Sequence, residues 1–64
     1  MWTTIYVATN TKLAKKIEKI LQDEGFLVKL KSCTIDENDS LFEVAVLEYE
    51  AIDAQNVLIE KSIL

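Results

Sequence analysis

The sequence predicts one α+β domain over residues 1–64, with the element order β-α-β-β-α. Three observations lead to this fold class. Segments rich in β-branched and aromatic residues are interleaved with two longer segments of helical periodicity. The only glycine, Gly25, stands where the first helical pattern stops. Finally, a chain of 64 residues has room for one small core and no second domain.

The first expected element is a strand over residues 2–9. Side chains alternate between the two faces of a strand, so Thr3, Ile5 and Val7 share one face. We expect Ile5 and Val7 to point into the core. The opposite face is then expected to carry Trp2, Thr4, Tyr6 and Ala8.

A helix is expected over residues 11–24, with Asn10 or Thr11 as its N-terminal cap. Its apolar residues recur with helical spacing and form one stripe, which consists of Leu13, Ala14, Ile17, Ile20 and Leu21. Gly25 follows where helices commonly end in a residue of positive φ. We therefore expect positive φ at Gly25.

Two strands are expected next, over residues 26–33 and 41–47, joined by a polar hairpin connection at 34–40. The core-facing residues expected in them are Val28, Leu30, Phe42, Val44 and Val46. The outward set is Leu27, Lys29, Lys31, Cys33, Glu43, Ala45 and Leu47.

A second helix is expected from about Glu48 to Ser62. Glu48 and Glu50 suit the positive end of its dipole. Its apolar arc is wider than packing on one side requires. That arc consists of Ala51, Ile52, Ala54, Leu58, Ile59 and Ile63.

These elements define a topology. A right-handed crossover makes the first two strands parallel, and the hairpin makes the third antiparallel to the second. With the third strand in the middle, the sheet is three-stranded and antiparallel with both helices on one face, a truncated ferredoxin-like unit without its last strand. The expected core is Ile5, Val7, Ile17, Ile20, Leu21, Val28, Leu30, Phe42, Val44, Val46, Ala54 and Leu58.

Composition excludes several classes of protein. The chain has one cysteine and no histidine, so an internal disulfide and a Cys/His zinc site are both excluded. Its apolar runs fall far short of the roughly 20 residues of a membrane-spanning helix. A single thiol and no signal sequence predict a cytoplasmic protein.

The N-terminal run MWTTIYVATN, the pattern A-x-x-I-x-x-x-L-x-x-E-G over residues 14–25, and the following FLVKLK resemble a known family. It is the group of short bacterial proteins described as prokaryotic signal-transducing proteins, whose function is unknown. The resemblance implies a βαββα fold and no established activity. Some relatives carry the label glutamate decarboxylase, but a pyridoxal enzyme needs a far larger pocket and a phosphate cradle.

The thiol of Cys33 and one acidic loop are the two candidates for reactive or ligating groups. Cys33 has no histidine to activate it, so we expect no chemical role for it. The loop residues Asp36, Glu37, Asn38 and Asp39 suggest calcium ligands. However, Leu41 and Leu47 occupy the positions where a calcium loop needs Gly and Glu, so a solvated turn is expected. We expect no catalytic, cofactor or metal site.

Charge is unevenly distributed along the chain. Residues 10–31 carry six lysines against three acids, a net charge of +3, whereas residues 32–64 carry one lysine against eight acids, a net charge of −7. The lysines of the first helix are Lys12, Lys15, Lys16 and Lys19. They are an ordinary solvated face or an anion-binding surface. The pI of about 4.6 and the lack of arginine argue against a nucleic-acid partner.

The sheet face away from the helices is the most informative feature. A contiguous apolar set on a bare sheet indicates an interface, and the first strand is also an unpaired edge. We expect a homodimer through that face or that edge, with another protein as the other candidate partner. The alternative is a sensor of a small molecule or anion, and an enzyme is a distant third. The candidate interface residues are Trp2, Tyr6, Leu27, Ala45 and Leu47.

Overall fold

The computed structural model describes residues 1–34 and 40–64 of the chain. The elements follow the expected order, and their boundaries lie close to the expected ones. They are β1 (Trp2–Ala8), α1 (Thr11–Asp23), β2 (Val28–Thr34), β3 (Ser40–Leu47), the 3₁₀ helix η1 (Glu48–Glu50) and α2 (Ala51–Glu60).

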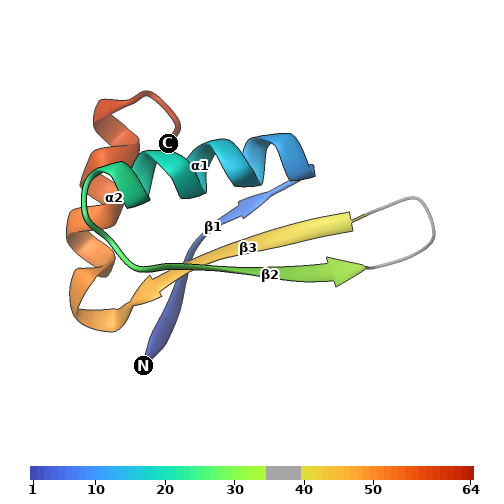
Figure 1. The fold of residues 1–64 in the computed structure, drawn as a ribbon, viewed down its shortest axis with the longest axis horizontal. Helices are drawn as coiled ribbons and strands as arrows, with labels where there is room; N and C mark the ends of the chain where they lie inside the picture. Colours follow the sequence, from blue (N-terminus) through green and yellow to red (C-terminus); the bar gives the residue numbers. More distant parts are fainter. Residues whose placement is uncertain (35–39) are drawn as a thin grey trace.

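The three strands form one sheet in the order β1-β3-β2. β3 pairs antiparallel with both neighbours, so β1 and β2 run parallel to each other. Both helices pack against the sheet, with α1 lying along it and α2 beside the end of β3 (Figure 1). The expected α+β fold class is therefore confirmed.

The main departure from the expected pattern lies in β1. Residues 2–4 pair with residues 45–47, but after a shift in register residues 6–8 pair with residues 42–44. Ile5 is thus an extra residue in β1, which is a β-bulge. Because side chains alternate strictly along a strand, one extra residue moves every later side chain to the opposite face.

The bulge reverses three side-chain assignments. Tyr6 is paired with Val44 and packs against the core, and Ala8 is fully buried. Val7, in contrast, is 47% exposed. The expectation that Val7 faces the core and that Tyr6 and Ala8 face away was therefore wrong, because it assumed an uninterrupted strand.

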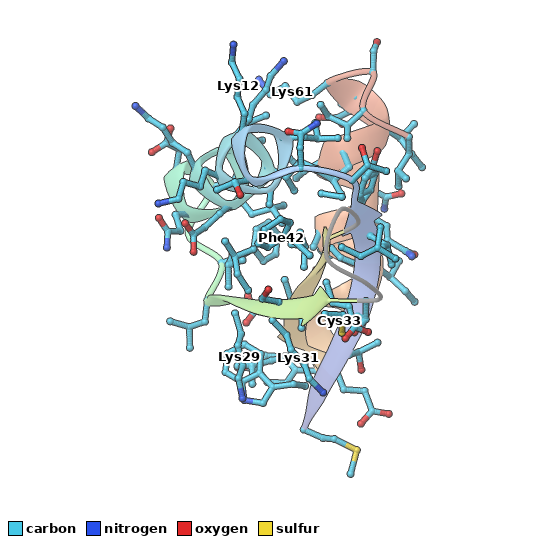
Figure 2. The ribbon with its side chains drawn as sticks, turned by 90° about the vertical axis from the view of Figure 1, so that its right-hand side faces the viewer. Lys12, Lys29, Lys31, Cys33, Phe42 and Lys61 are labelled. Atoms are coloured by element: carbon cyan, nitrogen blue, oxygen red, sulfur yellow. The ribbon has the colours of Figure 1, made fainter. Side chains whose placement is uncertain are left out.

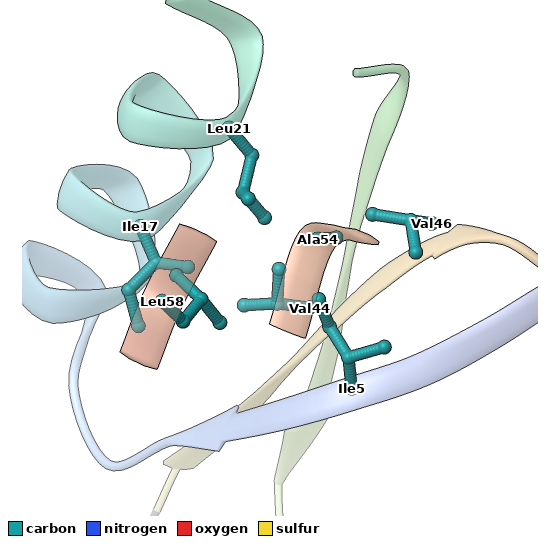
Figure 3. Packing of buried hydrophobic residues seen from close by; sticks show 7 residues of the cluster. All are labelled: Ile5, Ile17, Leu21, Val44, Val46, Ala54 and Leu58. Carbon is teal, nitrogen blue, oxygen red and sulfur yellow. The ribbon is translucent and has the colours of Figure 1, made fainter. Parts of the chain in front are cut away.

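The core draws on both helices, β1 and β3. Figure 3 shows its seven buried members converging from these elements: Ile5, Ile17, Leu21, Val44, Val46, Ala54 and Leu58. All seven were in the expected core. Val28 and Leu30 pack against this cluster as partly buried residues. Ile20 and Phe42, which were also expected in the core, lie outside this cluster and are half-buried, Phe42 between the sheet and α1 (Figure 2).

Helix α1 has a local signal at each end. At its start, the Oδ1 atom of Asn10 accepts a hydrogen bond of 2.7 Å from the backbone N–H of Leu13. At its end, Gly25 adopts φ of 92°, and the N–H of Phe26 donates to the carbonyl of Leu21 at 3.0 Å. This is a Schellman motif, and the expected positive φ of Gly25 is confirmed.

Helix α2 begins and ends differently. It is entered through η1, whose first backbone N–H, that of Glu48, donates to the carbonyl of Met1 at 2.8 Å. It ends in the same Schellman geometry as α1, since the N–H of Ile63 donates to the carbonyl of Leu58 at 2.8 Å. In α2, however, the residue of positive φ is Ser62, with φ of 60°.

Candidate functional site

The open face of the sheet, opposite the helices, contains a shallow hollow of about 250 Å³. Its position follows from the strand register. Thr4 and Lys29 flank Ala45 in one cross-strand row, and Val7 and Lys31 flank Glu43 in the next. The residues that line the hollow are Trp2, Thr4, Lys29, Lys31, Glu43 and Ala45.

An aromatic ring and a cation define one wall of the hollow. The Nζ atom of Lys29 lies 5.7 Å from the centroid of the Trp2 ring. This is within cation–π range, a contact that is worth about 0.5–1 kcal/mol at an exposed site. Trp2 stays 42% exposed, whereas Ala45 at the floor is only 8% exposed.

Glu43 occupies the centre of the open face. One carboxylate oxygen accepts from the hydroxyl of Thr4 at 3.4 Å, which is long for a bond of this kind. The other accepts from the thiol of Cys33 at 3.3 Å. The carboxylate therefore has a hydrogen-bond donor on each of the two neighbouring strands.

The same contact makes Cys33 a poor nucleophile. The hydrogen bond to Glu43 raises the pKa of the Cys33 thiol, and desolvation and the negative charge of Glu43 add to the effect. Lys31 opposes it only in part. Because the thiolate is the reactive form, a raised pKa lowers the reactivity of this cysteine at neutral pH.

The structure brings together only part of the expected interface set. Trp2 and Leu47 are cross-strand partners, and Ala45 lies beside them on the open face. Leu27 is 61% exposed and precedes the first residue of β2. Tyr6 does not belong to this surface, because the bulge turns it toward the helices.

Other expected features lie apart from the hollow. The lysines of α1 are exposed on the helix layer, as Lys12 illustrates in Figure 2, whereas Lys29 and Lys31 lie on the opposite side of the sheet. On the outer side of η1 and α2, Tyr49 and Ile52 are 81% and 74% exposed. The acidic run of residues 36–39, where a solvated turn is expected and not a calcium loop, lies outside the described residues.

The sequence predicted that Lys29, Lys31 and Glu43 face outward, but not that they meet at one site. The missing step was the strand register. The expected strand order already placed the third strand in the middle, but only the pairing of Lys31 with Glu43 and of Lys29 with Ala45 brings these side chains around one hollow.

Comparisons with known proteins add nothing to this geometry. No protein-family model, no curated protein and no solved structure matches the chain. Among the helices that the structure describes, none has the length and apolar character to span a membrane.

Proposed function

We propose that this protein is a non-catalytic interaction module that pairs with a second copy of itself through the outer edge of β1. The observation that carries the proposal is the contrast between the two edges of the sheet. β1 and β2 are its outer strands. β1 contains no charged side chain over Trp2–Ala8, whereas β2 carries Lys29 and Lys31. Lysines on an edge strand discourage pairing with another chain, so β2 is protected by charge and β1 is not.

Charge also favours the edge of β1 over the open face as the contact surface. The open face carries Lys29, Lys31 and Glu43 around its hollow. The buried centre of a protein interface is normally depleted in charged residues. The bulge also replaces Tyr6 on the open face by the smaller side chain of Val7.

Edge pairing would join two three-stranded sheets into one sheet of six strands. The unpaired backbone groups of β1 would then form hydrogen bonds with their counterparts in the second copy. The bulge at Ile5 interrupts this edge and shortens the pairing run. We therefore expect a weak dimer, and a domain of this size gains stability from the added contact.

Sedimentation equilibrium of the protein and of Val7→Lys tests this proposal. Val7 is 47% exposed and lies opposite Glu43, so a lysine there is compatible with the fold and has a carboxylate beside it. The unaltered chain is expected to sediment at twice its mass of 7.3 kDa at high micromolar concentration. Val7→Lys is expected to sediment as a monomer, because it places a charge on the pairing edge.

Ile52→Lys is the matched control. It makes the same change in charge at a residue of α2 that is 74% exposed, so it is expected to remain a dimer. A monomeric unaltered chain contradicts the proposal. If Ile52→Lys dissociates the dimer and Val7→Lys does not, the outer side of α2 is the interface instead.

Two further elements belong to this proposal. We place the protein in the cytoplasm, a location supported by its single unpaired thiol, Cys33. We also propose that it is one of the short bacterial signal-transducing proteins, on the resemblance of residues 1–10, 14–25 and 26–31. Its role there would be recognition through a protein contact and not chemistry.

A further inference from the structure

We infer that the hollow on the open face binds a small anion that carries a planar ring. In this assignment Lys29 and Lys31 hold the anionic group, and the ring lies against Trp2. The inference concerns the open face and does not depend on pairing through the edge of β1.

Charge supports an anion. The hollow is lined by two lysines and one carboxylate, so its local charge is +1 although the whole chain carries −4. The two oxygens of Glu43 already accept from Thr4 and Cys33, so the two lysines are the groups of the hollow that are left to hold an anion. Lys29 and Lys31 extend in the same direction from β2 (Figure 2).

The apolar part of the hollow supports a planar ring. Trp2 presents an indole of which 42% is exposed, and Ala45 forms a floor too small to block a close approach. Lys29 already lies over the indole at 5.7 Å, so an anionic group that pairs with this ammonium brings the rest of the ligand beside the ring. The volume of about 250 Å³ suits a small ligand, of the size of a mononucleotide or less.

The single tryptophan of the chain offers a direct measurement, since Trp2 lines the hollow. Because Trp2 also lies in β1, the titration is made in dilute solution, where the weak dimer dissociates. Four probes separate the two halves of the proposed ligand: adenosine monophosphate, benzoate, adenosine and inorganic phosphate. The first two combine a ring with an anionic group, and the last two supply one half each. We expect a saturable change in Trp2 fluorescence with adenosine monophosphate or benzoate, which weakens in high salt. Adenosine and phosphate are expected to bind at least about fivefold more weakly.

Charge-neutral variants test the two lysines. Lys29→Gln and Lys31→Gln are each expected to raise the Kd about two- to fivefold, the range for an exposed ionic contact. Lys16→Gln on α1 is the matched control, with the same change in charge on the opposite layer, and is expected to leave the Kd unchanged. Circular dichroism of each variant verifies that the fold is intact.

Three results would overturn the inference. The first is the lack of a saturable response to either ring-bearing anion. The second is equal affinity for adenosine and adenosine monophosphate, which would leave no role for the lysines. The third is an equal loss of affinity in Lys16→Gln, which would show a general effect of charge and not a site. Ligand binding that persists in dilute solution, where the weak dimer dissociates, would separate the two proposals.

Discussion

Helices α1 and α2 lie side by side on the same sheet, but they are specified in different ways. α1 is capped by Asn10 and closed by Gly25, and its apolar residues form one stripe. α2 is entered through η1, whose first N–H, that of Glu48, donates to the carbonyl of Met1, and it is followed by Ser62, a residue poorly suited to positive φ. The limits of α1 therefore depend on residues close to them in the sequence, whereas those of α2 depend on contacts with the rest of the fold.

Charge placement shows that capping and packing outweigh the helix dipole here. α1 carries Lys12 in its first turn and Asp23 in its last, so both charges oppose the dipole. α2 has Asp53 in its first turn, where a negative charge is favourable. Each such interaction contributes about 0.3–1 kcal/mol at an exposed site. The caps and buried stripe of α1 offset this deficit.

The largest expected effect comes from emptying the core that the two helices share. Ile17 of α1 is fully buried and packs in the cluster that includes Leu58 of α2. Ile17→Ala is expected to cost ~2–5 kcal/mol. A domain of this length has only about 3–10 kcal/mol in total, so chemical denaturation of the variant should show most of its cooperative transition lost. Ile59→Ala, at a residue that is 57% exposed, is the control and should change stability by less than about 0.5 kcal/mol.

The next effect concerns how the helices begin. Asn10→Ala removes the side chain that accepts from the N–H of Leu13 and is expected to destabilise the protein by about 1 kcal/mol. Glu50→Ala changes the residue that precedes α2, where no side chain in the described part of the chain makes a capping bond. It should have a smaller effect in urea unfolding. Equal losses of stability in the two variants would contradict the inferred difference between the N-terminal ends of α1 and α2.

The end of α1 gives an effect of similar size. A β-carbon at Gly25 would meet no atom within 4 Å, so Gly25→Ala introduces no clash with a neighbour. The expected cost is therefore the backbone strain of alanine at φ of 92°. It is partly offset because alanine lowers the conformational entropy of the unfolded chain. The net cost is expected to be about 1 kcal/mol in thermal or chemical unfolding. A more stable alanine variant would contradict the positive φ.

The difference between local and long-range contacts explains which parts of the structure could be predicted from the sequence. Asn10 and Gly25 act within a few residues of their own positions, so the limits of α1 could be read from the chain. The bulge at Ile5 arises from how β1 aligns with β3, some forty residues later in the chain. No local sequence pattern predicts it. The hollow is non-local for the same reason, since Lys31 and Glu43 become neighbours only through the register of β2 on β3.

The smallest effect is the most direct probe of the difference between the helix ends. Both ends have the same hydrogen-bond geometry. The residue of positive φ is Gly25 after α1, but it is Ser62, with φ of 60°, after α2. Ser62→Gly removes a strain of about 1–2 kcal/mol and adds entropy to the unfolded chain worth about 0.4–1 kcal/mol. The variant is therefore expected to be more stable by about 0.5 kcal/mol, a gain that shifts the melting temperature upward by a few degrees. Ser62→Ala keeps the β-carbon and should give no such gain, because the relief comes from the backbone and not from the loss of the hydroxyl. If Ser62→Gly instead lowers the melting temperature, the serine side chain stabilises the end of α2, and the two helix ends differ by chemistry and not by strain.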